Sequence, residues 1–132
     1  MPKFLVVDDE LLSRRVMSTI LSDFGEVVEA ETGTQAIELF RLSLESRDRF
    51  TAITLDVDLP DFKGHQVLTE IRKLEQTSSP IFRFPTKVLM VTSHADKETV
   101  VASIQAGCDQ YVIKPASPKA VLKKLQEMGV EV

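Results

Sequence analysis

Six polar residues of kinds that can handle a phosphoryl group stand directly after short apolar segments. They are Asp8 and Asp9 after residues 3–7, Asp56 after 52–55, Thr92 and Ser93 after 88–91, and Lys114 after 111–113. In an open sheet of parallel strands, ligands bind at the carboxyl ends of the strands. If the apolar segments are such strands, these side chains converge on one edge. Any one of them could merely cap a strand or a helix, but that explanation is poor for all six together.

The charges of this set indicate a metal-assisted reaction. Asp8, Asp9 and Asp56 would repel one another, and Lys114 offsets only part of their charge. A cluster of carboxylates favours a hard divalent cation, and a small number of protein ligands favours Mg²⁺ over Ca²⁺. With the cation bound, Asp56 can attack phosphorus as a nucleophile and form an aspartyl phosphate. The cation and Lys114 would neutralise the transferring oxygens.

The elements that must position these residues alternate along the chain. Apolar runs rich in β-branched residues, typical of strands buried on both faces, occupy residues 3–7, 27–30, 52–55, 88–91 and 111–113. Segments with helical spacing lie between the runs, and Ser117-Pro118 resembles a helix N-cap with proline in the first turn. This alternation predicts right-handed crossovers and a doubly wound α/β fold with a parallel sheet.

Five apolar stripes are expected to face the core of this fold. They are Leu12, Val16, Ile20 and Phe24; Ile37, Phe40 and Leu44; Val67, Ile71 and Leu74; Val100, Val101 and Ile104; and Val121, Leu122, Leu125 and Met128. None is assigned a functional role.

Composition narrows the class of protein. The chain has 132 residues, which favours a single domain over 1–132. A net charge of −4 leaves no basic footprint for nucleic acid, and the pairs Arg14-Arg15 and Lys123-Lys124 are expected to be solvated. No apolar run reaches the roughly 20 residues of a membrane helix. The single cysteine, Cys108, fits a reducing cytoplasm.

Taken together, the motifs resemble a response-regulator receiver domain of two-component signalling (CheY-like) over residues 3–128. The resemblance rests on Asp8-Asp9, on Leu55-Asp56-Val57-Asp58-Leu59-Pro60 with Gly64, on Val91-Thr92-Ser93, and on Tyr111-Val112-Ile113-Lys114-Pro115. Each motif is weak alone, but their order and spacing are specific. The resemblance implies a five-stranded sheet of flavodoxin-like order 2-1-3-4-5.

The resemblance also implies roles for individual residues. Asp56 would be the phosphoacceptor, and the Mg²⁺ ligands would be Asp9 directly, Asp8 nearby, Asp56, and the backbone carbonyl of Asp58. Lys114 and Thr92 would contact the phosphoryl group. Tyr111 would turn inward when Thr92 moves, and Pro115 would follow a cis peptide bond.

Four positions depart from the usual family pattern. Asp58 places an acid two residues beyond the acceptor, Lys63 precedes Gly64, His94 follows Thr92-Ser93, and Ala116 follows Lys114-Pro115. These departures leave the chemistry intact but affect its expected kinetics.

Two other functions were weighed against the receiver. A phosphohydrolase of the haloacid-dehalogenase type would use Asp56 as nucleophile and Asp58 as general acid, but its motif normally follows the first strand. A flavin or nucleotide binder would need a glycine- or hydroxyl-rich loop after residues 3–7, where Asp8, Asp9 and Glu10 stand instead. We expect a switch without turnover of a small substrate.

The expected partners are proteins. A histidine kinase or phosphotransfer protein would donate the phosphoryl group, and a downstream target or a second copy would bind the face formed by residues 96–128. A competing surface lies in the long connection 76–87, where Ile81, Phe82 and Phe84 are apolar. Two alternatives are open: a stand-alone domain that acts by binding other proteins, and a domain excised from a longer regulator or hybrid kinase.

Overall fold

The computed structural model describes residues 2–78, 85–94 and 96–132. The apolar residues 81–84 of the long connection therefore lie outside the described residues. Strands and helices alternate in the order β1 (Lys3–Val7), α1 (Leu11–Ser22), β2 (Glu26–Ala30), α2 (Gly33–Ser46), β3 (Ala52–Asp56), α3 (Gly64–Ser78), β4 (Lys87–Thr92), α4 (Lys97–Gln105), β5 (Gln110–Ile113) and α5 (Pro118–Glu127).

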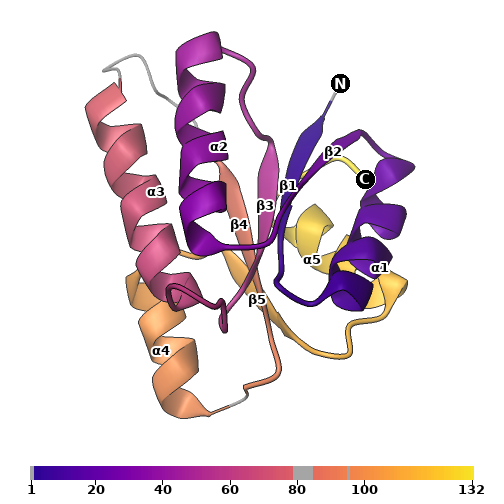
Figure 1. The fold of residues 1–132 in the computed structure, drawn as a ribbon. Coiled ribbons are helices and arrows are strands. Elements are labelled where there is room, and N and C mark those ends of the chain that lie inside the picture. The colour runs from indigo at the N-terminus through magenta and orange to yellow at the C-terminus, as the bar shows by residue number, and fades with distance from the viewer. Residues whose placement is uncertain (1, 79–84, 95) are drawn as a thin grey trace.

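The strands form one parallel sheet of order β2-β1-β3-β4-β5, which confirms the expected doubly wound fold. Figure 1 shows α1 and α5 on one face of the sheet and α2, α3 and α4 on the other. Each face has its own apolar core. Phe4, Leu21 and Leu125 belong to the first core, and Leu5, Phe40 and Ile71 belong to the second.

Local sequence explains where several helices begin. Thr32, Asp96 and Ser117 are N-caps of α2, α4 and α5, and each side chain accepts a hydrogen bond from the backbone N–H three residues later. Pro118 occupies the first turn of α5, where its missing N–H costs no hydrogen bond. The predicted start of the last helix is therefore confirmed.

The predicted core stripe of α1 is wrong for Leu12 and Val16, whereas Ile20 and Phe24 do pack against the core. Leu12 is 71% exposed and Val16 is also exposed, whereas Met17 and Leu21 are buried. Apolar residues occupy two neighbouring stripes of this helix, so the period alone does not say which stripe faces the sheet. The packed stripe includes Arg14, which we expected to be solvated and which is only 5% exposed.

The predicted stripe of α4 is also wrong. Ile104 is 61% exposed and Val101 is exposed too, while Ser103 is buried. The Ser103 hydroxyl can be buried because it donates a hydrogen bond to the Thr99 carbonyl at 2.9 Å. The structure thus leaves an apolar strip of α4 uncovered.

Among the described residues, no helix is both long and apolar enough to cross a membrane.

Candidate functional site

The three aspartates singled out in the sequence meet at the carboxyl edge of the sheet. β1 and β3 are adjacent and pair Val7 with Leu55, so Asp8 and Asp56 come next to each other where the two strands end. One carboxylate oxygen from each of Asp8, Asp9 and Asp56 lies within 4.8 Å of the other two. Asp8 and Asp56 are buried and Asp9 is exposed, so the cluster is open to solvent on one side.

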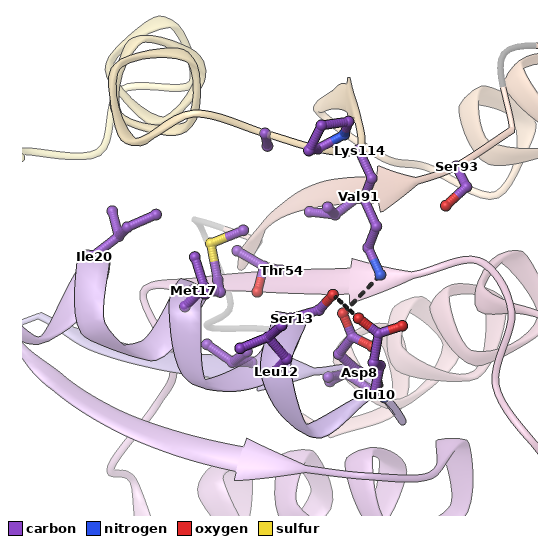
Figure 2. A pocket seen from close by; sticks show the side chains of 15 residues that line it. Asp8, Glu10, Leu12, Ser13, Met17, Ile20, Thr54, Val91, Ser93 and Lys114 are labelled. Carbon is purple, nitrogen blue, oxygen red and sulfur yellow. Dashed lines mark hydrogen bonds and ion pairs between the residues drawn. The ribbon is translucent and has the colours of Figure 1, made fainter.

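Lys114 reaches this cluster from the end of β5, which is two strands away from β3 in the sheet. It follows β5, and β4 lies between β5 and β3. Its Nζ donates to Oδ2 of Asp8 at 2.8 Å and to Oδ2 of Asp56 at 3.2 Å. Figure 2 shows the lysine extended toward Asp8. The Lys114–Pro115 peptide bond is cis, the isomer that the family resemblance implies.

Burial controls the protonation of Asp56. Burial raises the pKa of Asp56 from 3.8 to about 6; the Lys114 charge opposes this rise and the Asp8 charge adds to it. For Lys114, burial lowers the pKa, but hydrogen bonds and charge from Asp8 and Asp56 outweigh it and raise the pKa above its ordinary value. The lysine therefore stays cationic at neutral pH.

A buried arginine, Arg14, binds the backbone next to the acid cluster. Arg14 of α1 donates from Nη1 to the backbone carbonyl of Asp8 at 2.9 Å, and its other nitrogens pair with Glu29 at 2.8 Å and Glu31 at 3.1 Å. Sequence reasoning missed this role. Glu29 and Glu31, at the end of β2, could have indicated a buried basic partner. They lie near the site because β2 is next to β1 in the sheet.

The loop from β3 to α3 folds back over the end of β3. The Gly64 backbone N–H donates to the Val57 carbonyl at 2.6 Å, and Asp58 forms an isolated bridge with Lys63. A Cβ on Gly64 would lie 2.4 Å from the Asp56 carbonyl oxygen, so this close approach requires glycine. The Asp58 N–H points toward Oδ1 of Asp56 at 3.4 Å.

The Asp58 side chain is paired with two groups other than the site aspartates. Its carboxylate accepts a hydrogen bond from Lys63 Nζ at 2.9 Å and contacts Nε2 of His94. The hydrogen bond from Lys63, followed by that from His94, lowers the pKa of Asp58 below its ordinary value. Two of the four departures from the family pattern, Lys63 and His94, thus supply the partners of a third, the extra acid Asp58.

The two residues expected to switch lie on neighbouring strands. Thr92 ends β4 and is buried, and its hydroxyl accepts a hydrogen bond from the His94 backbone N–H at 2.9 Å. Tyr111 lies on β5, where it is half-buried against the core that α2 and α3 cover. Ser93 is exposed and lines a groove beside Lys114.

That groove, of about 470 Å³, runs from the acid cluster along α1. Leu12, Val16 and Ile20 form one wall, and Pro115 and Ala116 lie opposite. Figure 2 shows Leu12 and Ile20 on α1, with Asp8, Glu10 and Lys114 gathered at the end of the groove. An apolar surface therefore leads directly to the acids.

The residues present fit a divalent cation. The three carboxylates of the cluster carry up to three negative charges, and Lys114 offsets one of them. Hard cations take such oxygen ligands. The raised pKa of Asp56 indicates that its ionised form lacks full compensation from the protein alone.

Comparison with known proteins identifies the family. The family model of the response regulator receiver domain matches residues 4–126, so the chain belongs to that family. It is therefore a receiver domain with a phosphoacceptor role in two-component signalling. The haloacid-dehalogenase alternative is not favoured, because the acid pair follows β1 and the family match covers nearly the whole chain.

Individual relatives agree with this assignment. The chain is 35% identical to the probable transcriptional regulator ycf27 of Cyanophora paradoxa over 96% of its own length and 47% of the relative's. It thus spans about half the length of the curated relatives that it matches.

Solved structures show the same fold. Vibrio cholerae chemotaxis protein CheY4 is 30% identical, with a TM-score of 0.80 over 97% of this chain and 98% of that one. The receiver domain of the Arabidopsis thaliana histidine kinase CKI1, complexed with Mg²⁺ and BeF₃⁻, is 27% identical, with a TM-score of 0.81 over 95% of this chain and 90% of that one.

Proposed function

We propose that Asp56 is the phosphoacceptor of this receiver domain and that the reaction requires Mg²⁺. The cation would be held by the carboxylates of Asp8, Asp9 and Asp56 and by the backbone carbonyl of Asp58. The observation that carries the proposal is the meeting of three carboxylates and Lys114 at the carboxyl edge of the sheet. The Mg²⁺ and BeF₃⁻ bound by the CKI1 receiver domain support it.

The residues of the chain have separate tasks in this reaction. One Asp56 carboxylate oxygen forms a bond to phosphorus while the bond from phosphorus to the donor breaks, and the donor group leaves with the electron pair of that bond. Bound Mg²⁺ supplies charge neutralisation for the oxygens of the transferring group. Lys114, already aimed at Asp56, stays protonated and binds one of these oxygens. The Thr92 hydroxyl then donates a hydrogen bond to the product.

A small phosphodonor tests the acceptor. Incubation with acetyl phosphate and Mg²⁺ should add one phosphoryl group, detected by intact mass, and a chelator should block the addition. Asp56→Asn should abolish labelling, and labelling that persists in this variant would contradict the assignment. Asp9→Ala should weaken Mg²⁺ binding strongly, because one of few carboxylate ligands is lost.

We propose that the physiological donor is a phosphohistidine on a helix of a histidine kinase or phosphotransfer protein. The groove beside α1 is lined mostly by apolar residues and includes Asp8 and Lys114, which suits a helix that presents one phosphorylated side chain to Asp56. Its exposed residues Leu12 and Val16 would contact that helix.

Substitution on the groove wall separates docking from chemistry. Leu12→Glu should slow phosphotransfer from a donor protein at least tenfold and leave labelling by acetyl phosphate unchanged. Leu42→Glu is the matched control, because Leu42 is also exposed on a helix but lies on α2, away from the groove. If both variants accept phosphate from the donor at the wild-type rate, the groove is not the docking surface.

We further propose that output is read on the face formed by residues 96–128. Val101 and Ile104 of α4 and Ile113 of β5 expose apolar surface there, and Tyr111 lies on the same strand. A protein partner with a complementary apolar patch would bind this face after Thr92 and Tyr111 reorient. Its binding completes a signalling switch that turns over no small substrate.

Amide-exchange footprinting with beryllofluoride, an analogue of the phosphoryl group, tests the output face. Protection should change over 96–128 when the analogue binds. A change confined to residues 78–86 would move the output surface to the long connection. Mass measurement in solution with and without the analogue distinguishes a second copy of the chain from another protein as the partner.

The proposal also includes the extent of the domain, its location and its relation to nucleic acid. Residues 1–132 would act as one receiver unit in the cytoplasm, and nucleic acid would not be a direct partner of this unit.

A further inference from the structure

The loop of residues 57–63 is anchored to a helix that takes no part in the site described so far. Asp61 lies in this loop, and its carboxylate accepts three hydrogen bonds from the first turn of α2. Oδ1 accepts from the Gly33 N–H at 2.8 Å, and Oδ2 accepts from the N–H and the hydroxyl of Thr34 at 2.8 and 2.6 Å. The carboxylate therefore acts as a second N-cap for α2, supplied by another part of the chain.

The chemistry of the contact favours a charged carboxylate. The first backbone N–H groups of a helix have no partner within the helix, and the helix dipole attracts negative charge to this end. The hydroxyl and N–H of Thr34 and the N–H of Gly33 lower the pKa of Asp61 to about 2. Asp61 is thus ionised throughout the range in which the protein is expected to work.

The neighbouring residues show that α2 and the loop are closely fitted. A Cβ on Gly33 would lie 3.1 Å from Oδ1 of Asp61, 3.0 Å from the Phe62 ring and 2.7 Å from Val67. A larger residue at position 33 would therefore push the loop and α3 away from α2. The contact depends on a glycine at the first position of the helix and on an acid in the loop.

The same loop carries the Asp58 carbonyl, which is one of the proposed Mg²⁺ ligands. The Asp58 side chain contacts His94, which follows β4, and Lys63 of the same loop. A backbone ligand cannot change rotamer to find the cation, so its position depends entirely on how the loop is held. The tie from Asp61 to α2 holds the same loop at a second point.

We propose that Asp61 is a positioning residue for the cation site, which clamps the 57–63 loop to α2 and so holds the Asp58 carbonyl in place. The proposal rests on the Mg²⁺ site proposed above. The side chain of Asp61 touches neither the cation nor the phosphoryl group and acts through the loop. Groups that orient metal ligands commonly change metal affinity by about 10- to 100-fold when removed.

Two variants at the same helix end separate positioning from simple loss of stability. Asp61→Ala removes the clamp. Thr32→Ala removes the N-cap hydroxyl, which accepts a hydrogen bond from the Gln35 N–H at 3.0 Å at the same end of α2. Both variants deprive α2 of a capping acceptor, but only Asp61 belongs to the loop that carries Asp58. Both should lower the thermal midpoint.

Mg²⁺ affinity, measured by calorimetry on the unphosphorylated protein, is the deciding readout. Asp61→Ala should weaken Mg²⁺ binding about tenfold, and Thr32→Ala should leave it within twofold of wild type. Amide exchange should accelerate over residues 58–64 in Asp61→Ala alone.

Two further variants keep the test decisive. Thr34→Val removes one donor from the other side of the clamp and should weaken Mg²⁺ binding in the same direction by a smaller factor. Asp61→Asn keeps one acceptor oxygen and should fall between wild type and Asp61→Ala. Equal Mg²⁺ affinity in wild type and Asp61→Ala, or equal losses in Asp61→Ala and Thr32→Ala, would overturn the proposal. Failure of Asp9→Ala to weaken Mg²⁺ binding would instead overturn the metal site itself.

Discussion

The Thr92 hydroxyl accepts a hydrogen bond from the His94 backbone N–H at 2.9 Å, so the switch residue is already engaged within its own loop. This contact uses a lone pair of the hydroxyl oxygen, so the hydroxyl hydrogen stays available for a phosphoryl group on Asp56. A hydrogen bond to a charged phosphoryl oxygen contributes about 1.5–3 kcal/mol, which is enough to shift a two-state equilibrium by about one to two decades.

Thr92→Ala should accept phosphate but transmit it poorly. The substitution leaves Asp56, Lys114 and the carboxylate cluster intact and removes the hydroxyl that signals their state. Labelling by acetyl phosphate should stay within a few-fold of wild type, while the exchange or spectral change around Tyr111 should be lost. A phosphorylated Thr92→Ala protein with the full wild-type change at Tyr111 would contradict this coupling. Thr99→Ala, on α4, serves as a control.

Asp58 is expected to affect the lifetime of the aspartyl phosphate. Two like charges about 6 Å apart interact by roughly 3 kcal/mol at an effective dielectric constant of 20, but the Lys63 ammonium offsets the charge of Asp58 here. Asp58→Asn removes the negative charge that pairs with Lys63 and leaves one amide oxygen as an acceptor. The dephosphorylation rate, followed by intact mass after donor removal, should change without loss of uptake. An unchanged lifetime would show that this group of side chains does not control access of water.

The stability of the metal-free protein should depend on pH through Asp56. Its pKa rises from 3.8 to about 6 on folding, so between these values the folded state binds more protons than the unfolded state. Stability is therefore lost as pH rises through this window. With a chelator present, the thermal midpoint of Asp56→Asn relative to wild type should increase from pH 4 to pH 7. A difference that stays constant over this range would contradict the raised pKa.

Arg14 should matter far more for stability than its neighbour Arg15. Arg14 is buried and bonded to the Asp8 carbonyl, Glu29 and Glu31, whereas Arg15 is exposed and shares only Glu29. Arg14→Met should lower the free energy of unfolding by about 2–3 kcal/mol, because buried acceptors lose charged donors. Arg15→Met should cost less than about 0.5 kcal/mol. Urea denaturation of the two variants measures the difference, and equal losses would contradict it.

The order of strands and helices and most of the site were predictable from the sequence. Strands of a parallel sheet are buried on both faces, so they read as short apolar runs whose ends are marked by the first polar residue. Because all these ends share one edge, Asp8, Asp9, Asp56 and Lys114 could be placed together before any contact was known. The predicted bounds of the first strand, residues 3–7, match the structure.

Only the tertiary structure decided which helix faces are covered and which side chains pair across the site. α1 carries apolar residues on two adjacent stripes, and the choice of Met17 and Leu21 over Leu12 and Val16 comes from packing against the sheet. The pairing of Asp58 with His94 and the clamp from Asp61 to Gly33 join segments 36 and 28 residues apart. Such contacts depend on the paths that two loops follow after neighbouring strands and helices. Neither the composition of the chain nor its hydrophobic periodicity contains that geometry.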